Sequence, residues 1–388
     1  MEAESAGRRS PEGFSPFLFV GFAIASIGGP LALPNFLPGT AGDEGIESAG
    51  LVVLLSLAVF AAPLVLWLVY SRRVVSPGGL TAFVEAAAGR KAAFVHGWIW
   101  TFAYFLYLPY TITFVVYDVL TPIFPGLHPY RWVLELVLPV AIVLLVLAPV
   151  RLALALLVLV GLAQLVLMLV LGGVTLDHVP VRFAHEPSVD PIGRGVGGTA
   201  LLFLCASLPL YLGAEVRGGS RTVRRGLTAA VAVVGACFFV AALPLATVPG
   251  ALRDFPVPAA TIAKYYSGRP LEVAVALGIA AGTLALIVAE YLALGRLLHW
   301  LHGLPLRRTL VWIAGPFVIA DAISLIDPEA FYEKLLKPSL GALFVSQLIV
   351  FLVFPLFRRG VRWLPLVVVA SALAVWGFYT LVAGSAST

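Results

Sequence analysis

One acidic residue stands alone in a long apolar stretch of this 388-residue chain. Glu290 lies in LALIVAEYLALG, residues 284–295, with no lysine or arginine within one helical turn. An ionisable group isolated in an apolar helix is costly and is a functional candidate. Because burial disfavours the charged form of a carboxyl group, we expect Glu290 to take up and release a proton. The alternative is a protonated side chain bonded to a helix carbonyl for structure only, and the sequence favours neither.

Two apolar stretches are interrupted by residues that do not suit a helix interior. The first, residues 17–37, reads FLFVGFAIASIGGPLALPNFL and carries Gly28, Gly29 and Pro30 in its middle. The second, residues 199–214, contains Pro209 after a run of small residues. Proline lacks an N–H and clashes with the carbonyl four residues earlier, and glycine is costly within a helix. Two such interruptions, each opening a set of five apolar spans, indicate a binding site at mid-depth.

Unwound helices expose backbone groups that bind ligands without charged side chains. Amides at a helix start suit a carboxylate, and carbonyls at a helix end suit an ammonium group. Because neither interruption contains a charged residue, we expect the backbone to bind both ends of an α-amino acid. The expected amide donors are Ser26, Gly28 and Gly29, with Ile27 in the same segment; the expected carbonyls belong to Ala23, Ile24, Phe203 and Ala206; and the small Cys205 and Ser207 leave room for the substrate.

Aromatic residues accompany these interruptions. We expect Phe203 to close the site as a gate, although an ordinary core or lipid-facing phenylalanine fits the sequence equally well. Tyr104, Tyr107 and Tyr110 form a stripe at helical spacing. Such stripes are more often core packing, but Tyr107 or Tyr110 is a candidate for substrate contact.

The elements that must position these residues are membrane-spanning helices. The chain is 61% hydrophobic and only 12% charged, too little charge for a soluble surface of this length. Runs of about 18 or more apolar residues predict transmembrane helices. The sequence therefore predicts an all-α polytopic membrane protein of about eleven spans: 14–37, 48–70, 92–120, 131–149, 151–173, 196–214, 226–248, 271–297, 308–326, 337–357 and 362–384.

The distribution of basic residues predicts orientation. Seventeen of the 25 lysines and arginines fall in segments that face the cytoplasm if the N-terminus does, as the excess of basic residues in inner loops requires. We therefore expect a cytoplasmic tail of residues 1–13, an N-terminus inside and a C-terminus outside the plasma membrane. The basic residues sit in loops between spans, which argues against nucleic-acid binding, and the scattered histidines and cysteines predict no metal, no cofactor and no disulfide.

Four motifs, in order along residues 14–360, together resemble the amino acid–polyamine–organocation (APC) permeases. The first helix carries SIGGP, a variant of the family's glycine-rich break, and SPGGLTAFVEAAAGRKAAFVHGWIWTFAY, residues 76–104, is similar to the segment leading into the third helix. ALGRLLHWLHGLP, residues 293–305, resembles the exit of the eighth helix. GAEVRGGSRTVRRGL, residues 213–227, resembles the end of the sixth helix through Glu215, Val216, Arg217, Arg221, Val223 and Arg225, and departs from the family at Gly218, Gly219 and Arg224.

The resemblance implies a LeuT-type fold in which helices 1 and 6 are discontinuous. Its two inverted halves of five helices would be residues 14–173 and 196–357, followed by one additional helix at 362–384. It places Glu290 beside the break of the first helix, with Gln164 as a neutral neighbour where relatives carry a lysine. Because 285–289 contains no serine or threonine to ligate sodium, we predict proton coupling through Glu290.

Four other polar residues have weaker patterns. Glu215 and Arg217 are expected to form part of an inner gate with Arg72, Arg73 or Arg296, although surface ion pairs are often idle. For Asp321 and Gln347 we expect structural roles.

The leading functional hypothesis is a secondary transporter that moves an amino acid or related amine by alternating access. An exchanger or uniporter without ion coupling, and a sensor that binds an amino acid without moving it, remain open alternatives. A metal carrier of the same fold is disfavoured because the interruptions lack Asp, Asn, Met and His. An enzyme is disfavoured because the spans contain no catalytic set. The oligomeric state is not indicated.

Overall fold

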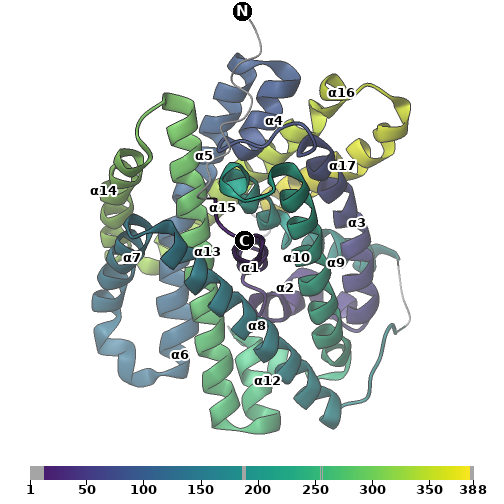
Figure 1. Ribbon diagram of the computed structural model, residues 1–388. Helices are drawn as coiled ribbons and strands as arrows, with labels where there is room; N and C mark the ends of the chain where they lie inside the picture. Colours follow the sequence, from purple (N-terminus) through teal and green to yellow (C-terminus); the bar gives the residue numbers. More distant parts are fainter. Residues whose placement is uncertain (1–12, 186–188, 254, 256, 385–388) are drawn as a thin grey trace, which may run out of the picture.

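A computed structural model describes residues 13–185, 189–253, 255 and 257–384. Of the predicted cytoplasmic tail, residues 1–12 lie outside this described part. The described residues form a bundle of helices (Figure 1), and their single β-bridge joins Phe14 to Val216.

The first half of the chain contains one interrupted helix and four long ones. The interrupted helix comprises α1 (Pro16–Ala25) and α2 (Ala32–Ile46), and it is followed by α3 (Ala49–Tyr70) and the short α4 (Gly79–Ala88). The third span is α5 (Arg90–Thr113), which continues through the π-helical η1 (Phe114–Leu120) into α6 (Thr121–Ile123). The short η2 (Pro125–Tyr130) leads into the fourth span, α7 (Arg131–Leu147), and α8 (Val150–His178) is the fifth.

The second half opens with another interrupted helix, α9 (Val189–Leu201) followed by the 3₁₀ helix η3 (Leu204–Glu215). The next span is α10 (Gly219–Ala242) with η4 (Leu243–Thr247), and two short helices, α11 (Gly250–Arg253) and α12 (Pro258–Ser267), lead to α13 (Arg269–His302). Then come α14 (Leu306–Ser324), α15 (Pro328–Leu352), α16 (Phe354–Phe357), η5 (Val361–Trp363) and α17 (Leu364–Gly384).

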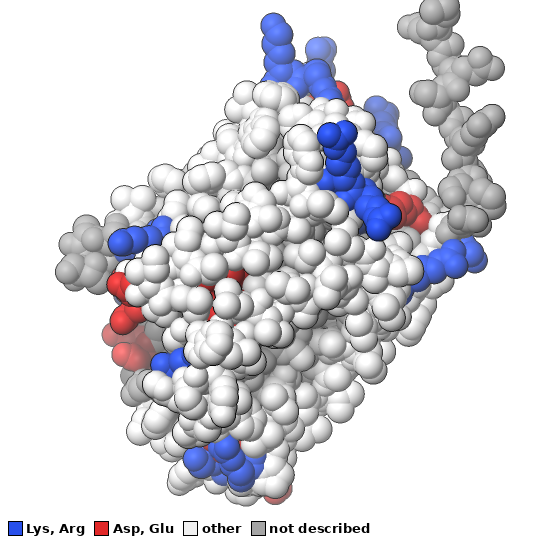
Figure 2. Space-filling model, turned by 90° about the vertical axis from the view of Figure 1, so that its left-hand side faces the viewer, with Lys and Arg blue, Asp and Glu red and all other residues white. Residues whose placement is uncertain are grey.

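These helices make the chain a multi-pass membrane protein. Nine helical segments of the described residues are long and apolar enough to cross a bilayer. The two helices beyond these nine are the interrupted α1–α2, whose pieces are short, and α14, which carries Arg307, Arg308 and Asp321. Figure 2 shows one side of the bundle with a broad middle zone almost free of charged side chains and with charges gathered toward its ends. The prediction of about eleven helices is confirmed.

Helix boundaries depart from the predicted spans mainly at polar ends. The tenth span was predicted from residue 337, but α15 begins at Pro328, because the Asp327 side chain accepts a hydrogen bond of 3.0 Å from the Ala330 amide and caps the helix. The sixth span likewise begins at Val189, before its apolar run. Apolar run length marks the hydrocarbon-spanning part of a helix and misses a polar first turn.

The interrupted helices occupy the centre of the bundle. The labels of α1 and α2 lie in the middle of Figure 1, between α8, α10 and α13, and α1 packs most extensively on α8 and α10. In α1, every residue from Phe19 to Ala25 is buried except Val20. Broken backbone in hydrocarbon needs such a protein environment, because lipid cannot satisfy its hydrogen bonds.

Candidate functional site

The first interruption runs from Ser26 to Leu31 between α1 and α2. Gly28 and Gly29 take φ values of 61° and 63°, the left-handed region in which residues with a Cβ atom are strained. Pro30 follows and supplies no N–H. The Gly-Gly-Pro sequence thus both permits the turn and prevents the helix from continuing through it.

The second interruption separates α9 from η3 at Leu202 and Phe203. Their amides bond to the carbonyls three residues earlier, Thr199 and Ala200, at 3.2 Å each. The chain then remains 3₁₀-helical for 12 residues around Pro209. A 3₁₀ run of this length is uncommon, and Pro209 contributes to it by removing one α-helical bond.

The two interruptions meet at a cavity of about 940 Å³, which Gly28, Leu202 and Cys205 help to line. A Cβ atom on Gly28 would lie 3.3 Å from the Leu202 carbonyl oxygen, so the two backbones are in close contact. The cavity extends from there to Asp190 and Arg194 at the start of α9, which form an ion pair of 3.3 Å. Its other lining residues come mainly from α2, α15 and α17.

Three of the side chains or backbones predicted at the site line this cavity, namely Gly28, Cys205 and Tyr107. Ser26 is fully buried, and its hydroxyl donates to the Phe22 and Ala23 carbonyls at 2.9 and 3.1 Å. Ser207 donates to the Leu204 carbonyl and accepts from Gln347 at 3.4 Å. Both hydroxyls are therefore already engaged with the protein.

The predicted backbone acceptors also have partners. The carbonyls of Ile24 and Phe203 accept from the amides of Ile27 and Ala206 at 3.2 and 2.9 Å. The Leu202 carbonyl, which the sequence analysis did not single out, lies closer to the cavity. Only the three-dimensional contact between the interruptions identifies it.

Phe203 and Tyr110 do not line the cavity. Phe203 is fully buried between Phe60 of α3 and Phe238 of α10, with ring centroids 5.4 and 6.1 Å away. Tyr110 packs between Tyr107 and Tyr332, with centroids 5.0 and 5.5 Å away. In this conformation Phe203 is a core residue.

Gln164 of α8 supports the first interruption directly. Its Oε1 accepts a hydrogen bond of 3.2 Å from the Leu31 amide, one of the first amides of α2, which lack a helical partner. A Cβ atom on Gly282 of α13 would fall 2.2 Å from the same oxygen, so α13 needs glycine at this point. Gln164 therefore joins α8 and α13 to the interruption.

Glu290 lies on α13 eight residues beyond Gly282, about 12 Å farther along the helix axis. It is therefore not at the level of Gln164, and the structure does not make them neighbours. Glu290 is fully buried, and neither carboxyl oxygen has a hydrogen-bond partner among the described residues. It lies close enough to Tyr107 and Cys205 to interact electrostatically with both. Its carboxyl group thus stands behind two side chains that line the cavity.

The end of the bundle that carries Gly13 is closed by an ion pair and two backbone bonds. Arg296 of α13 donates from Nε and Nη2 to the two carboxylate oxygens of Glu215, at 2.5 and 3.0 Å. The Phe14 amide donates to the Glu215 carbonyl at 3.0 Å, and the Arg217 amide donates to the Phe14 carbonyl at 3.1 Å. Of the three partners predicted for Glu215, Arg296 is the one in contact, while Arg217 donates to the Gly13 carbonyl at 2.6 Å.

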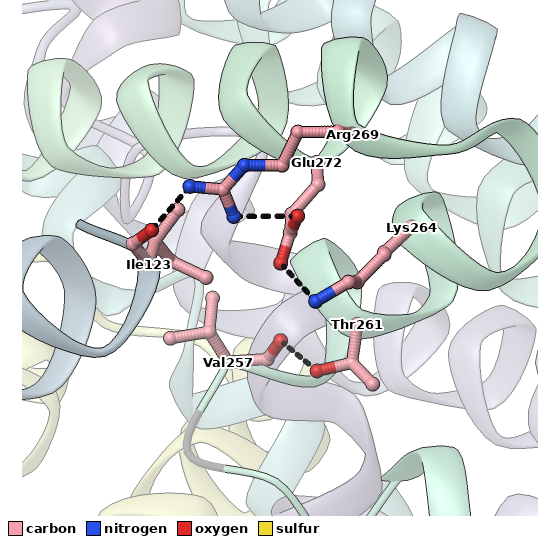
Figure 3. Close-up of polar contacts among 6 residues, drawn as sticks. All are labelled: Ile123, Val257, Thr261, Lys264, Arg269 and Glu272. Atoms are coloured by element: carbon pink, nitrogen blue, oxygen red, sulfur yellow. Dashed lines mark hydrogen bonds and ion pairs between the residues drawn. The ribbon is translucent and has the colours of Figure 1, made fainter. Parts of the chain in front are cut away.

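The opposite end carries a polar cluster on α12 and α13 (Figure 3). The buried Glu272 carboxylate pairs with Arg269 at 2.7 Å and with Lys264 of α12 at 3.5 Å. Arg269 also donates to the Ile123 carbonyl at the end of the third span at 2.5 Å. The α12 helix is held to α2 as well, because the Ala259 amide donates to Asn35 Oδ1 at 3.2 Å. These bonds attach α12 to α13 and α2, and the start of α13 to the third span.

Comparison with solved structures places the architecture. The chain resembles MhsT, crystallised with L-phenylalanine, with a TM-score of 0.62 and 15% identity over 93% of this chain and 97% of that one. It also resembles a manganese transporter of Eremococcus coleocola, crystallised with an aromatic bis-isothiourea compound, with a TM-score of 0.59 and 14% identity over 95% and 87% of the two chains. Neither a family model nor a curated protein sequence matches. At identities this low the similarity is evidence of the fold alone. It confirms the predicted LeuT-type fold with helices 1 and 6 discontinuous.

Proposed function

We propose that this protein is a secondary active transporter that moves an amino acid or related amine across the cytoplasmic membrane by alternating access. The main observation that supports this proposal is the contact between the two interrupted helices at one end of the cavity. Helix ends of opposite partial charge meet there, which suits a ligand that carries both charges. MhsT was crystallised with such a ligand.

Transport is coupled to protons through Glu290 in this proposal. A carboxyl group without a partner in the membrane interior is a site where a proton can be exchanged. Its position behind Tyr107 and Cys205 brings it next to the substrate, so occupancy of the cavity and protonation of Glu290 influence each other electrostatically. Gln164 is uncharged and supports the backbone of the interruption.

The substrate class is tested by thermal-shift screening of the purified protein against the amino acids and polyamines. A stabilising shift with one compound identifies the class, because a ligand that binds only the folded state raises its stability. If none of these compounds shifts the melting temperature, the proposal that the substrate is an amino acid or amine is contradicted.

The coupling is tested by uptake of that compound into proteoliposomes under an imposed pH gradient. Wild-type uptake should increase with an inward proton gradient, and Glu290→Gln should lose this response while keeping substrate binding. Glu44→Gln, which neutralises an exposed carboxylate on α2, is the matched control and should respond as wild type does. An unchanged response in Glu290→Gln removes the proton role.

A sensor that binds without transporting is distinguished by counterflow. Preloaded proteoliposomes accumulate labelled substrate if the protein is a carrier, with or without ion coupling. Binding without counterflow favours the sensor. Manganese is disfavoured as cargo because the described residues contain no group of three or more His, Cys, Asp or Glu side chains placed to hold a metal ion.

A further inference from the structure

Two buried acidic side chains meet between α7 and α14, away from the central cavity. Glu135 and Asp321 are both fully buried and close enough to interact electrostatically. Glu135 Oε1 accepts hydrogen bonds from Thr113 Oγ1 at 2.6 Å and Ser324 Oγ at 2.7 Å. Ser324 also donates to the Asp321 carbonyl at 2.6 Å, which fixes the helix turn that carries Asp321 against Glu135.

The remaining three carboxyl oxygens of this pair have no partner. Glu135 Oε2, Asp321 Oδ1 and Asp321 Oδ2 make no hydrogen bond within the described part of the chain. No lysine or arginine forms an ion pair with either group among those residues. Buried carboxyl groups are ordinarily paired with a positive side chain, bound to a metal ion or protonated, and these three oxygens have no positive side chain bonded to them in the described part of the chain.

Thr113, whose hydroxyl donates to Glu135, also lines a cavity of about 370 Å³. Three acidic side chains line it, Asp118 from η1 and Glu329 and Glu333 from the start of α15. Glu329 and Glu333 are exposed, so the cavity is open to solvent at its mouth. Clustered carboxylates around a cleft raise the local concentration of cations.

Arg131, at the start of α7 and one turn before Glu135, also borders this region. It stacks over the Tyr117 ring with its Cζ 4.9 Å from the centroid and interacts with Asp118, while its buried Nε makes no hydrogen bond within the described part of the chain. Tyr332 of α15 packs against Tyr110. The wall that carries Tyr117 and Asp118 is π-helical, a conformation that is rare and is often found at functional sites.

We propose that Glu135 and Asp321, with the hydroxyls of Thr113 and Ser324, bind a hard inorganic cation that enters through the acidic cavity. Carboxylate and hydroxyl oxygens are the ligands that such ions take, and two carboxylates balance the charge of a divalent ion such as Ca²⁺.

This site is connected to the central cavity by a row of tyrosines. Tyr332 lines the acidic cavity, Tyr110 packs on it, and Tyr107 packs on Tyr110 and lines the central cavity. The binding itself does not depend on the proposed transport function, since it is measured without a substrate.

The test uses the full chain, purified in detergent and depleted of metal with a chelator in choline buffer. Equilibrium binding of radioactive Ca²⁺ and, separately, Na⁺ is measured at neutral pH for wild type, Asp321→Asn and Glu135→Gln. Asp177→Asn, an exposed carboxylate on α8, is the matched control. We expect saturable binding of one ion per chain in wild type and in the control, and at least ten-fold weaker binding in the two site variants.

Thermal unfolding keeps the result interpretable if a variant is merely unstable. Without cation, Asp321→Asn should melt no lower than wild type, because it removes an uncompensated buried charge. The cation should raise the melting temperature of wild type and leave that of Asp321→Asn unchanged. Absence of saturable binding of both ions to wild type overturns the proposal, as expected for a pair that holds only a proton. Equal binding by wild type and both site variants also overturns it.

Discussion

Single residues at the first interruption act mainly through backbone geometry. Gly29 combines φ of 63° with a tight position in which an added Cβ atom would lie 3.2 Å from the Gly282 carbonyl carbon. Gln164 supplies the acceptor for an amide that the turn leaves without a helical partner. These contacts explain how a helix can be open at its middle and still be held in place.

Gly29→Ala should therefore impair both folding and substrate binding. The left-handed conformation costs a residue with a Cβ atom about 1–2 kcal/mol, before the contact with α13 is counted. Gly173→Ala in α8 is the control, since nothing lies within 4 Å of the added atom, and alanine there should be neutral or stabilising. Melting temperature and thermal shift with substrate measure both effects. Equal behaviour of the two variants would contradict a strained turn.

Gln164→Met should lower stability by about 1–3 kcal/mol, because it leaves the buried Leu31 amide unpaired at nearly constant side-chain volume. Gln164→Glu keeps the acceptor oxygen and should be less destabilising when protonated. Urea or thermal unfolding of the purified variants gives the order. If the methionine variant is as stable as wild type, the hydrogen bond is not what holds the start of α2.

At the scale of elements, the conformation is set by which ends of the helices are tied together. The N-terminal segment, η3 and α13 meet through Phe14, Glu215 and Arg296, whereas the central cavity reaches the opposite end beside α9. If the N-terminus is inside, as the distribution of basic residues predicts, this end faces the cytoplasm. We then expect release of the Glu215–Arg296 pair to accompany opening toward the cytoplasm.

Cys205 reports on this closure because it lines the central cavity. In a Cys237→Ser background, an impermeant thiol reagent added outside should label Cys205, and bound substrate should protect it. Glu215→Gln weakens the closure, so labelling from the cytoplasmic side should increase and labelling from outside should fall. Glu44→Gln should change neither. Identical labelling in Glu215→Gln and wild type would show that the ion pair does not control access.

The α12–α13 cluster is expected to stabilise the opposite end. Glu272→Gln removes the charge that pairs with both Arg269 and Lys264 and should cost about 1 kcal/mol or more. Glu85→Gln breaks the exposed pair with Arg90 and should change stability by less than about 0.5 kcal/mol. Thermal unfolding compares them, and equal losses would mean that burial of Glu272 adds nothing.

At the scale of the whole molecule, the distribution of basic residues predicts an orientation in the membrane. The basic residues concentrate in the segments assigned to the cytoplasm, and the described loops that carry Arg307 and Arg182 lie on opposite sides of the bilayer in that arrangement. Both residues are exposed.

Cysteines at these two positions should label from opposite sides. In a background lacking Cys205 and Cys237, Arg182→Cys should react with an impermeant reagent in intact cells, and Arg307→Cys only after the membrane is opened. The reverse pattern would contradict the predicted orientation and would place the end that carries the Glu215–Arg296 pair outside.

The sequence by itself determined the membrane class, the helix count and both interruptions. Apolar length, Gly-Gly-Pro and Pro209 are local signals, since hydrocarbon requires continuous helices except where backbone is enclosed. It also identified Glu290 as a candidate, because an ionisable residue isolated in an apolar run can be recognised without knowledge of its tertiary contacts. The polar starts of α9 and α15 were missed, since capping residues carry little apolar signal.

Only the tertiary structure decided how these parts meet. Phe203 turns into the core between Phe60 and Phe238, Gln164 sits at a different level from Glu290, and Glu135 meets Asp321 across 186 positions of sequence. Side-chain direction and helix register depend on contacts between segments far apart in the chain, and no local pattern encodes them. A local sequence thus fixes where a helix must break, and the packing of distant helices fixes what the break faces.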